Sequence, residues 1–225
     1  MSKLLNEHAK GVYIIAATPF FDDDSIDYDS LDRLTDFYLE KGVSGITILG
    51  MMGEAQKLSP DESKNVMNRV IKRVDGRVPV IVGVSNPDIK KLIKLSNSAM
   101  AAGAAGIMVA PNSSHHNDET IFNYYVEVDK ALESKIPMIY QDFPLVTKAP
   151  ISLDCLMRII REIPQVVMLK HEDWPGLEKL SELRSRSKAE GLRRISILCG
   201  NGGLYLPQEL SRGADGAMTG FAYPE

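Results

Sequence analysis

The sequence contains little cysteine and no excess of basic residues. Its 225 residues include 2 cysteines, Cys155 and Cys199, which are too few for a disulfide-stapled scaffold. Lysine and arginine number 26 against 30 aspartates and glutamates, and the formal net charge is −4. This balance predicts no basic surface for nucleic acid or for an anionic membrane.

Long hydrophobic runs are also absent. No apolar stretch approaches the roughly 18 residues that a membrane-spanning helix needs. Residues 1–8 lack the apolar core of a secretory signal. The overall content, 44% hydrophobic and 25% charged, is typical of a soluble globular domain. We therefore expect a cytoplasmic protein with neither membrane nor nucleic acid as a partner.

The sequence does contain a regular alternation of two patterns. Short apolar runs alternate with amphipathic stretches of helical period, as in a parallel α/β sheet. The predicted strands cover residues 12–18, 45–50, 78–83, 106–110, 137–141, 166–170, 195–200 and 216–220. Most of their carboxyl ends lie about 30 residues apart, the length of one βα unit. The spacing predicts a single (β/α)₈ TIM barrel.

Helix-capping signals fall between these strands. Asp29-Ser30 is predicted to cap the helix that ends at Lys41-Gly42, and Ser59 followed by Pro60 predicts a second helix start. Gly103 is among the glycines predicted to end helices. The local signals agree with the barrel period.

Lys170 ends the sixth predicted strand after Val166-Val167-Met168-Leu169. The chemistry of such barrels lies at the carboxyl ends of the strands. On a period of two, Lys170 shares a face with Met168 and Val166, where burial would favour a neutral amine that can attack a carbonyl. The alternative is a structural ion pair with Glu172 or Asp173, and the strand pattern alone leaves both open.

Tyr140 ends the preceding strand, one βα repeat before Lys170. We expect the two side chains to face one another at the top of the barrel. A phenol beside an imine-forming lysine can relay protons. A rim tyrosine with a satisfied hydroxyl is the alternative. His171, Glu172 and Asp173 could serve as acids or bases, although alternation points His171 away from the barrel interior.

Two glycine-containing loops are further candidates. Gly50-Met51-Met52-Gly53-Glu54 follows the second strand, and its backbone amides could hold a carboxylate. Gly200-Asn201-Gly202-Gly203 follows the seventh strand. Each loop alone is a weak signal, because many βα turns contain glycine.

Taken in order, the motifs resemble the dihydrodipicolinate synthase/N-acetylneuraminate lyase family. They are Thr18-Pro19, the Gly50 to Glu54 loop, Tyr140, Lys170 and Gly216-Ala217-Met218-Thr219-Gly220. The resemblance covers essentially the whole chain. It implies a class I aldolase or lyase without metal or other cofactor, which binds pyruvate or another 2-oxo acid as an imine and also handles an aldehyde.

The resemblance also implies roles for individual residues. Lys170 would form the Schiff base, and Tyr140 would donate and accept protons. The residues that would bind substrate are Thr18, Gly50, Met51, Met52, Gly200 and Met218. Such proteins are commonly homodimers or homotetramers.

The sequence departs from the better-known members in three loops. Met51 and Met52 replace hydroxyl residues, so a backbone carboxylate clamp survives but a hydroxyl proton relay does not. The loop after the fourth strand lacks a tyrosine. The loop after Tyr140 is one residue longer before Pro144 and lacks an arginine. These departures argue against lysine-biosynthetic synthase activity, and nothing favours sialic-acid cleavage.

Two other functions stay open at this point. A 2-oxo sugar-acid dehydratase would use the same imine chemistry, and a non-catalytic barrel would only bind such acids. The eighth predicted strand ends at Gly220, close to Glu225. Because a complete barrel takes about 250 residues, we expect one domain, residues 1–225, truncated before the eighth helix and the family's C-terminal helical segment.

Overall fold

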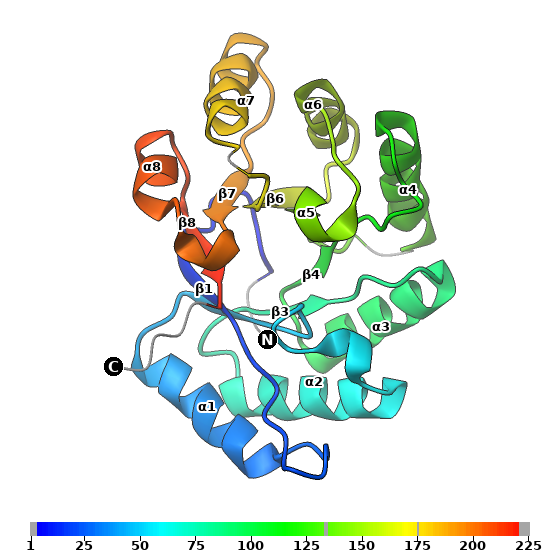
Figure 1. The fold of residues 1–225 in the computed structure, drawn as a ribbon, viewed down its shortest axis with the longest axis vertical. Helices are drawn as coiled ribbons and strands as arrows, with labels where there is room; N and C mark the ends of the chain where they lie inside the picture. Colours follow the sequence, from blue (N-terminus) through cyan, green and yellow to red (C-terminus); the bar gives the residue numbers. More distant parts are fainter. Residues whose placement is uncertain (1–3, 133–134, 175, 221–225) are drawn as a thin grey trace.

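The computed structural model describes residues 4–132, 135–174 and 176–220. Within these residues, eight parallel strands follow one another from β1 to β8 and close into a barrel. The helices form a ring outside the strands (Figure 1). The predicted TIM barrel is confirmed.

Each predicted strand is present, with ends that differ by a few residues. The strands are β1 (Gly11–Ile15), β2 (Gly45–Ile48), β3 (Val80–Gly83), β4 (Gly106–Val109), β5 (Met138–Asp142), β6 (Val166–His171), β7 (Ser196–Cys199) and β8 (Gly216–Thr219). The α-helices are α1 (Tyr28–Glu40), α2 (Pro60–Val74), α3 (Ile89–Ala102), α4 (Asp118–Ala131), α5 (Pro144–Thr147), α6 (Leu153–Glu162), α7 (Leu177–Ala189) and α8 (Leu206–Ser211). Of two 3₁₀ helices, η1 (Ala55–Lys57) directly follows the first glycine loop and η2 (Asn201–Gly203) lies in the second.

Helix α8 connects β7 to β8, so it is not the helix that would follow β8. Beyond β8 the described part of the chain contains only Gly220. That the following helix lies outside this sequence stays a prediction.

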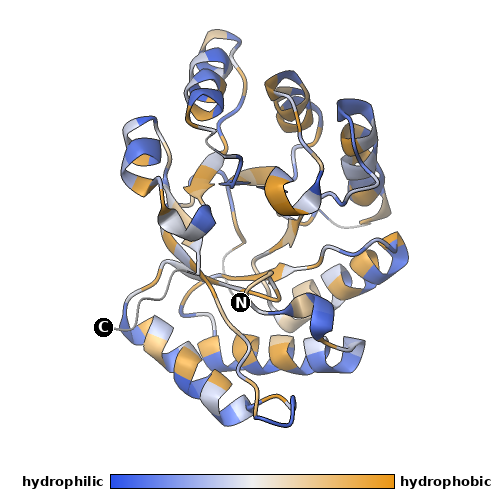
Figure 2. Ribbon diagram, viewed as in Figure 1, coloured by the Kyte–Doolittle hydropathy of each residue, from blue (hydrophilic) through white to orange (hydrophobic). Residues whose placement is uncertain are grey.

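Buried side chains form two clusters on opposite sides of the barrel wall. The inner cluster contains Tyr13, Met108, Ile139 and Met168, contributed by alternate positions of the strands. The larger outer cluster lies between strands and helices. Its members include Ile48, Leu92, Tyr125 and Leu156. Figure 2 shows the corresponding hydropathy, with apolar faces of the outer helices turned toward the strands. Which cluster a strand residue joins therefore tells which way its side chain points.

The helix starts follow local capping chemistry. Ser59 caps α2 with a full capping box to Glu62, and Pro60 is the first helical residue, as predicted. The predicted cap of α1 is wrong by two residues. Asp27 is the cap, and its carboxylate accepts a hydrogen bond from the Ser30 amide at 2.9 Å. Several polar residues near that start can serve as caps, so composition alone did not select one.

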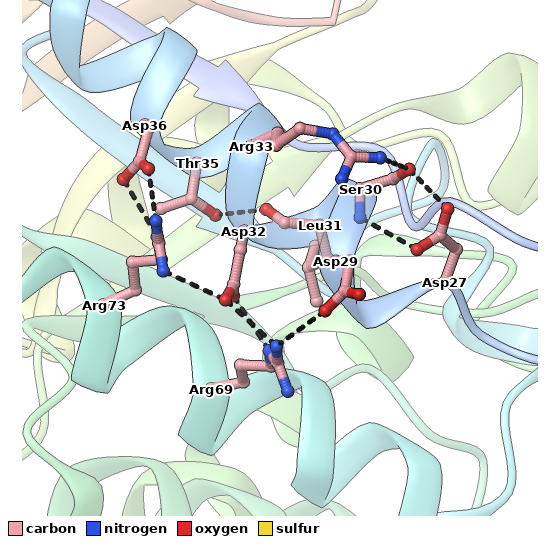
Figure 3. Close-up of polar contacts among 10 residues, drawn as sticks. All are labelled: Asp27, Asp29, Ser30, Leu31, Asp32, Arg33, Thr35, Asp36, Arg69 and Arg73. Atoms are coloured by element: carbon pink, nitrogen blue, oxygen red, sulfur yellow. Dashed lines mark hydrogen bonds and ion pairs between the residues drawn. The ribbon is translucent and has the colours of Figure 1, made fainter.

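A network of ion pairs joins α1 to α2 on the outer surface (Figure 3). The Asp32 carboxylate accepts hydrogen bonds from Arg69 Nε at 2.8 Å and from Arg73 at 3.0 Å. Arg73 also pairs with Asp36. The Asp32 side chain is 20% exposed, whereas Asp29, 3.5 Å from Arg69, is 86% exposed. Asp32 is thus the central acceptor of the network.

We expect Asp32→Asn to lower the midpoint of thermal unfolding by roughly 2 °C, because Arg69 and Arg73 lose the charged acceptor that they share at a partly exposed site. The difference should shrink in 1 M salt, which screens exposed pairs. Thermal melts of wild type, Asp32→Asn and the control Asp29→Asn test this. An equal shift in Asp29→Asn would contradict a central role for Asp32.

Candidate active site

Lys170 lies near the end of β6 and points into the barrel. Its neighbour two residues earlier, Met168, belongs to the inner cluster. In the sheet, Lys170 is paired with Gln141 of β5 and with Leu198 of β7. The residue is 4% exposed. The prediction that this lysine shares a face with Met168 is confirmed, and an isolated ammonium group here would be poorly solvated.

A buried carboxylate compensates the charge of Lys170. Oε2 of Glu172 lies 3.1 Å from Lys170 Nζ, and it also accepts a hydrogen bond from Gln141 Nε2 at 2.7 Å. The Glu172 residue is 5% exposed. One carboxylate oxygen therefore stands between an amine and an amide inside the barrel. The ion pair that the sequence left open is present.

The loop after β7 holds the same glutamate from the other side. The Asn201 backbone amide donates to Glu172 Oε1 at 3.4 Å, and Asn201 Nδ2 donates to the Glu172 carbonyl oxygen at 3.0 Å. A Cβ at Gly200 would stand 2.1 Å from Glu172 Cγ. Only glycine at position 200 leaves space for this side chain. Gly200 thus lies beside the Lys170–Glu172 pair, and its contact with substrate stays a prediction.

The methionine loop crosses the same end of the barrel. Thr18 Oγ1 donates a 2.7 Å hydrogen bond to the Gly53 carbonyl oxygen and so ties this loop to the end of β1. Met52 lies over the end of β8, because a Cβ at Gly220 would stand 2.0 Å from Met52 Sδ. Among the described residues, the amides of Met51 and Met52 donate to no hydrogen-bond acceptor. They are available to an anion.

The remaining predicted substrate residues have different surroundings. Gly50 packs against Ile15 and Met108 of the inner cluster. Met218 is fully buried in that cluster. Both belong to the barrel interior.

Tyr140 does not face Lys170, and the sequence prediction is wrong on this point. The tyrosine is 0% exposed and belongs to the outer cluster. Its ring packs against that of Tyr125 on α4, with centroids 4.8 Å apart. Its hydroxyl has no hydrogen-bond partner among the described residues. Burial, in addition to the neighbouring Tyr125, raises the pKa of the Tyr140 phenol well above its usual range.

The physical reason is the register of two neighbouring strands. Parallel strands place paired residues on the same face, and Lys170 is paired with Gln141, not with Tyr140. The pairing of β5 with β6 contains a register shift, because Val166 and Met168 are paired with consecutive residues of β5 and Val167 is skipped. As a result, Val166 lies in the outer cluster and Met168 in the inner one. The predicted shared face of Lys170 and Val166 is therefore also wrong.

Sequence reasoning missed Gln141 and left the role of Glu172 open. A signal for Glu172 was present, because it lies two residues after Lys170 and so shares its face if the strand geometry continues. For Gln141 the signal was the loop after Tyr140, which has one more residue before Pro144 than the better-known family members have.

We expect Tyr140→Phe to keep the reaction rate of wild type within about threefold, because the phenol lies outside the barrel and its oxygen bonds to nothing described. Removing an unpaired buried hydroxyl should leave stability unchanged or slightly higher. Steady-state kinetics and a thermal melt measure both. A loss of a hundredfold or more would return Tyr140 to the catalytic site.

A cavity of about 370 Å³ opens beside this region. It lies among the loops that follow β2, β3, β4 and β5, and Met51, Asn86, Asn112 and Val146 are among its lining residues. Lys170 is not one of them. The cavity therefore adjoins the lysine site without enclosing it.

A second polar cluster lies on the outer side of the same strands. Lys179 of α7 donates to Asp142 at 2.6 Å and to Asp173 at 3.0 Å. His171 Nδ1 lies 3.1 Å from Glu209 of α8. Burial raises the pKa of Asp142, although Lys179 opposes the shift. His171 points away from the barrel interior, as predicted.

The described residues contain no group of His, Cys, Asp and Glu arranged to hold a metal ion. His115 packs on Tyr124 instead, with ring centroids 4.3 Å apart. In the same described ranges, no helix is long and apolar enough to cross a membrane.

A closed eight-stranded barrel agrees with the comparisons to known proteins. A model described as the dihydrodipicolinate synthetase family matches residues 8–222. The chain belongs to this family. The resemblance seen in the motifs is confirmed.

Individual members of the dihydrodipicolinate synthetase family are similar over nearly all of this chain. A crystal structure of a dihydrodipicolinate synthase from Rhodopseudomonas palustris has 48% identity and a TM-score of 0.94, and the match covers 97% of this chain and 72% of that one. The 4-hydroxy-tetrahydrodipicolinate synthase of Sorangium cellulosum is 32% identical, over 93% of this chain and 67% of its own length. A synthase from Thermotoga maritima has 26% identity and a TM-score of 0.85, covering 95% and 70%. The prediction that the chain is an enzyme of this family's lyase class is confirmed.

Proposed function

We propose that this protein is a class I aldolase or lyase that binds a pyruvate-type 2-oxo acid as a Schiff base on Lys170. The observation that carries the proposal is the position of this amine at the carboxyl end of β6, buried and pointing inward. In TIM barrels the reacting groups lie at this end. Family membership supports the same chemistry.

The contacts of Lys170 suit imine formation. An amine must lose a proton before it attacks a carbonyl, and an acceptor oxygen stands 3.1 Å from Nζ. Because both side chains are buried, little water competes with a carbonyl for the amine. The iminium that forms can accept the electron pair of a breaking carbon–carbon bond.

The methionine loop supplies a place for the substrate carboxylate in this proposal. The amides of Met51 and Met52 have no acceptor among the described residues, and adjacent backbone amides in a turn bind anions. Thr18 fixes the loop through Gly53. The methionine side chains need not contribute polar groups.

Dehydration of a 2-oxo sugar acid is a second candidate, favoured by the carboxylate of Glu172 beside the lysine. A carboxyl group there can protonate a leaving hydroxyl. Product analysis separates the two reactions, because cleavage gives pyruvate and an aldehyde, whereas dehydration keeps the carbon chain intact.

Reductive trapping tests the proposal. The protein is incubated with pyruvate and other 2-oxo acids, reduced with borohydride, digested and examined by mass spectrometry. We expect a stoichiometric adduct on Lys170. If the folded protein gives no adduct with any of these acids, the imine mechanism fails. Binding without an adduct would instead support the non-catalytic barrel.

The homodimer or homotetramer implied by the resemblance stays a prediction, as does the cytoplasmic location. One solved relative, at 25% identity and a TM-score of 0.84, is described as a monomeric dihydrodipicolinate synthase variant.

A further inference from the structure

Glu172 faces the Lys170 amine, where the sequence had suggested that Tyr140 would lie. Tyr140 lies in the outer cluster. Tyr13 does point inward, but its ring packs on Gly45, the first residue of β2, toward the opposite end of the barrel. His171 and Asp142 contact α8 and α7 outside the wall. Among the described residues, Glu172 is the titratable side chain within contact of the Lys170 amine.

We propose that Glu172 is the acid–base catalyst of the imine chemistry and that Gln141 is its positioning residue. The proposal rests on the function proposed above. A catalytic base must lie within hydrogen-bond reach of the proton it takes, and Oε2 of Glu172 is 3.1 Å from Lys170 Nζ. Acid–base catalysis at Lys170 then does not require a tyrosine hydroxyl.

The surroundings of Glu172 fix its carboxylate for this task. Gln141 Nε2 donates to Oε2 at 2.7 Å, and an amide cannot take up a proton at neutral pH, so Gln141 orients the carboxylate without competing for the proton. Asn201 holds Oε1 and the backbone of Glu172. The missing Cβ of Gly200 leaves room for the side chain.

The proton balance closes with this single carboxylate. Glu172 takes one proton from the Lys170 ammonium, and the neutral nitrogen bonds to C2 of the 2-oxo acid as the C2–O π pair moves to oxygen. The glutamic acid protonates that oxygen. The regenerated carboxylate then removes a second proton from nitrogen and returns it to the hydroxyl. Water leaves, and the nitrogen lone pair forms the iminium.

The same group serves carbon–carbon cleavage. Glu172 accepts the proton of the substrate hydroxyl on C4, the C4–O bond becomes a carbonyl, and the C3–C4 bond breaks. Its electron pair forms the C2–C3 double bond of an enamine while the iminium π pair moves to nitrogen. The aldehyde leaves, and Glu172 holds the proton.

The rate of adduct formation tests this role. Wild type and Glu172→Gln are mixed with pyruvate and quenched with borohydride at a series of times. We expect adduct formation in the variant to be about 10² to 10³ times slower, with the same final stoichiometry on Lys170. Exchange of the pyruvate methyl protons for deuterium, followed by NMR, should slow by a similar factor.

Two further variants separate chemistry from structure. Glu172→Ala leaves a space of carboxylate size, and added formate should restore the rate in proportion to its concentration. Asp173→Asn removes a neighbouring carboxylate that pairs with Lys179 and should react at the wild-type rate. Thermal melts confirm that each variant is folded.

Different results would overturn the role of Glu172 and the proposed function. A Glu172→Gln rate within threefold of wild type overturns the role of Glu172, as does a folded Glu172→Ala protein that formate does not rescue. A variant that never reaches the wild-type stoichiometry also overturns it, because Glu172 would then only hold the lysine. Wild type without any adduct on Lys170 refutes the proposed function itself.

Discussion

Replacing Lys170 with methionine is expected to abolish the borohydride-trapped adduct and to reduce turnover by about 10⁴-fold or more, because no other described amine lies at the inner end of β6. The variant should also be less stable. Glu172 would remain buried without its cation, which typically costs about 3–5 kcal/mol. Trapping, steady-state kinetics and urea unfolding measure the three effects.

The double variant Lys170→Met with Glu172→Gln is the matched control. It removes both charges and keeps the side-chain volumes, so we expect much of the lost stability to return while activity stays absent. Inactivity in the stable double variant would show that the single variant fails for a chemical reason. An adduct in either variant would place the Schiff base on a different lysine and contradict the proposal.

The fold was predictable because its signals repeat along the chain. Each strand is a short apolar run, and one run follows another at the spacing of a βα unit, so an error in one segment does not change the inferred period. Capping was predictable where the signals coincide, as at Ser59, Pro60 and Glu62. At the start of α1 several acceptors compete, and the prediction missed Asp27.

The site was predictable only in part, because it depends on which face of the sheet each residue of a strand points to. Lys170 was placed correctly, since Met168 and Lys170 lie beyond the register shift and alternate regularly. Tyr140 was misplaced because an offset of one residue moves a side chain to the other face of the sheet. The shift between β5 and β6 leaves no mark in hydropathy, since Val166, Val167 and Met168 are all apolar.

Apart from its ion pair with Lys170, the contacts of Glu172 could not be predicted from its neighbours in sequence. They come from β5 and from the loop after β7, and they include a residue without a side chain, Gly200. The sequence showed a glycine loop after β7, but not that its first glycine makes room for a carboxylate from β6. Such complementarity appears only when the barrel is closed.

The outer polar cluster makes a different prediction about stability. Asp142 is 1% exposed and depends on Lys179 of α7, whose Nζ lies 2.6 Å from its carboxylate. We expect Lys179→Met to lower the free energy of unfolding by about 3 kcal/mol at pH 8, because the variant leaves a buried carboxylate without its cation. The folded variant should keep most of its turnover rate, because this cluster lies outside the barrel wall.

The loss in Lys179→Met should depend on pH in a direction that the surroundings of Asp142 fix. Burial already raises the pKa of Asp142 above its ordinary value of 3.8, and Asp173 adds to the shift, while Lys179 and His171 oppose it. Removing the lysine raises this pKa further. The folded variant then binds a proton that the unfolded chain has lost, so its stability falls as pH rises from the ordinary value through the raised one.

Urea unfolding at pH 5 and pH 8 should show the smaller loss of stability at pH 5. The variant Asp142→Asn with Lys179→Met should remove that dependence, and a loss equal at both pH values in Lys179→Met would show that Asp142 is not the group that titrates.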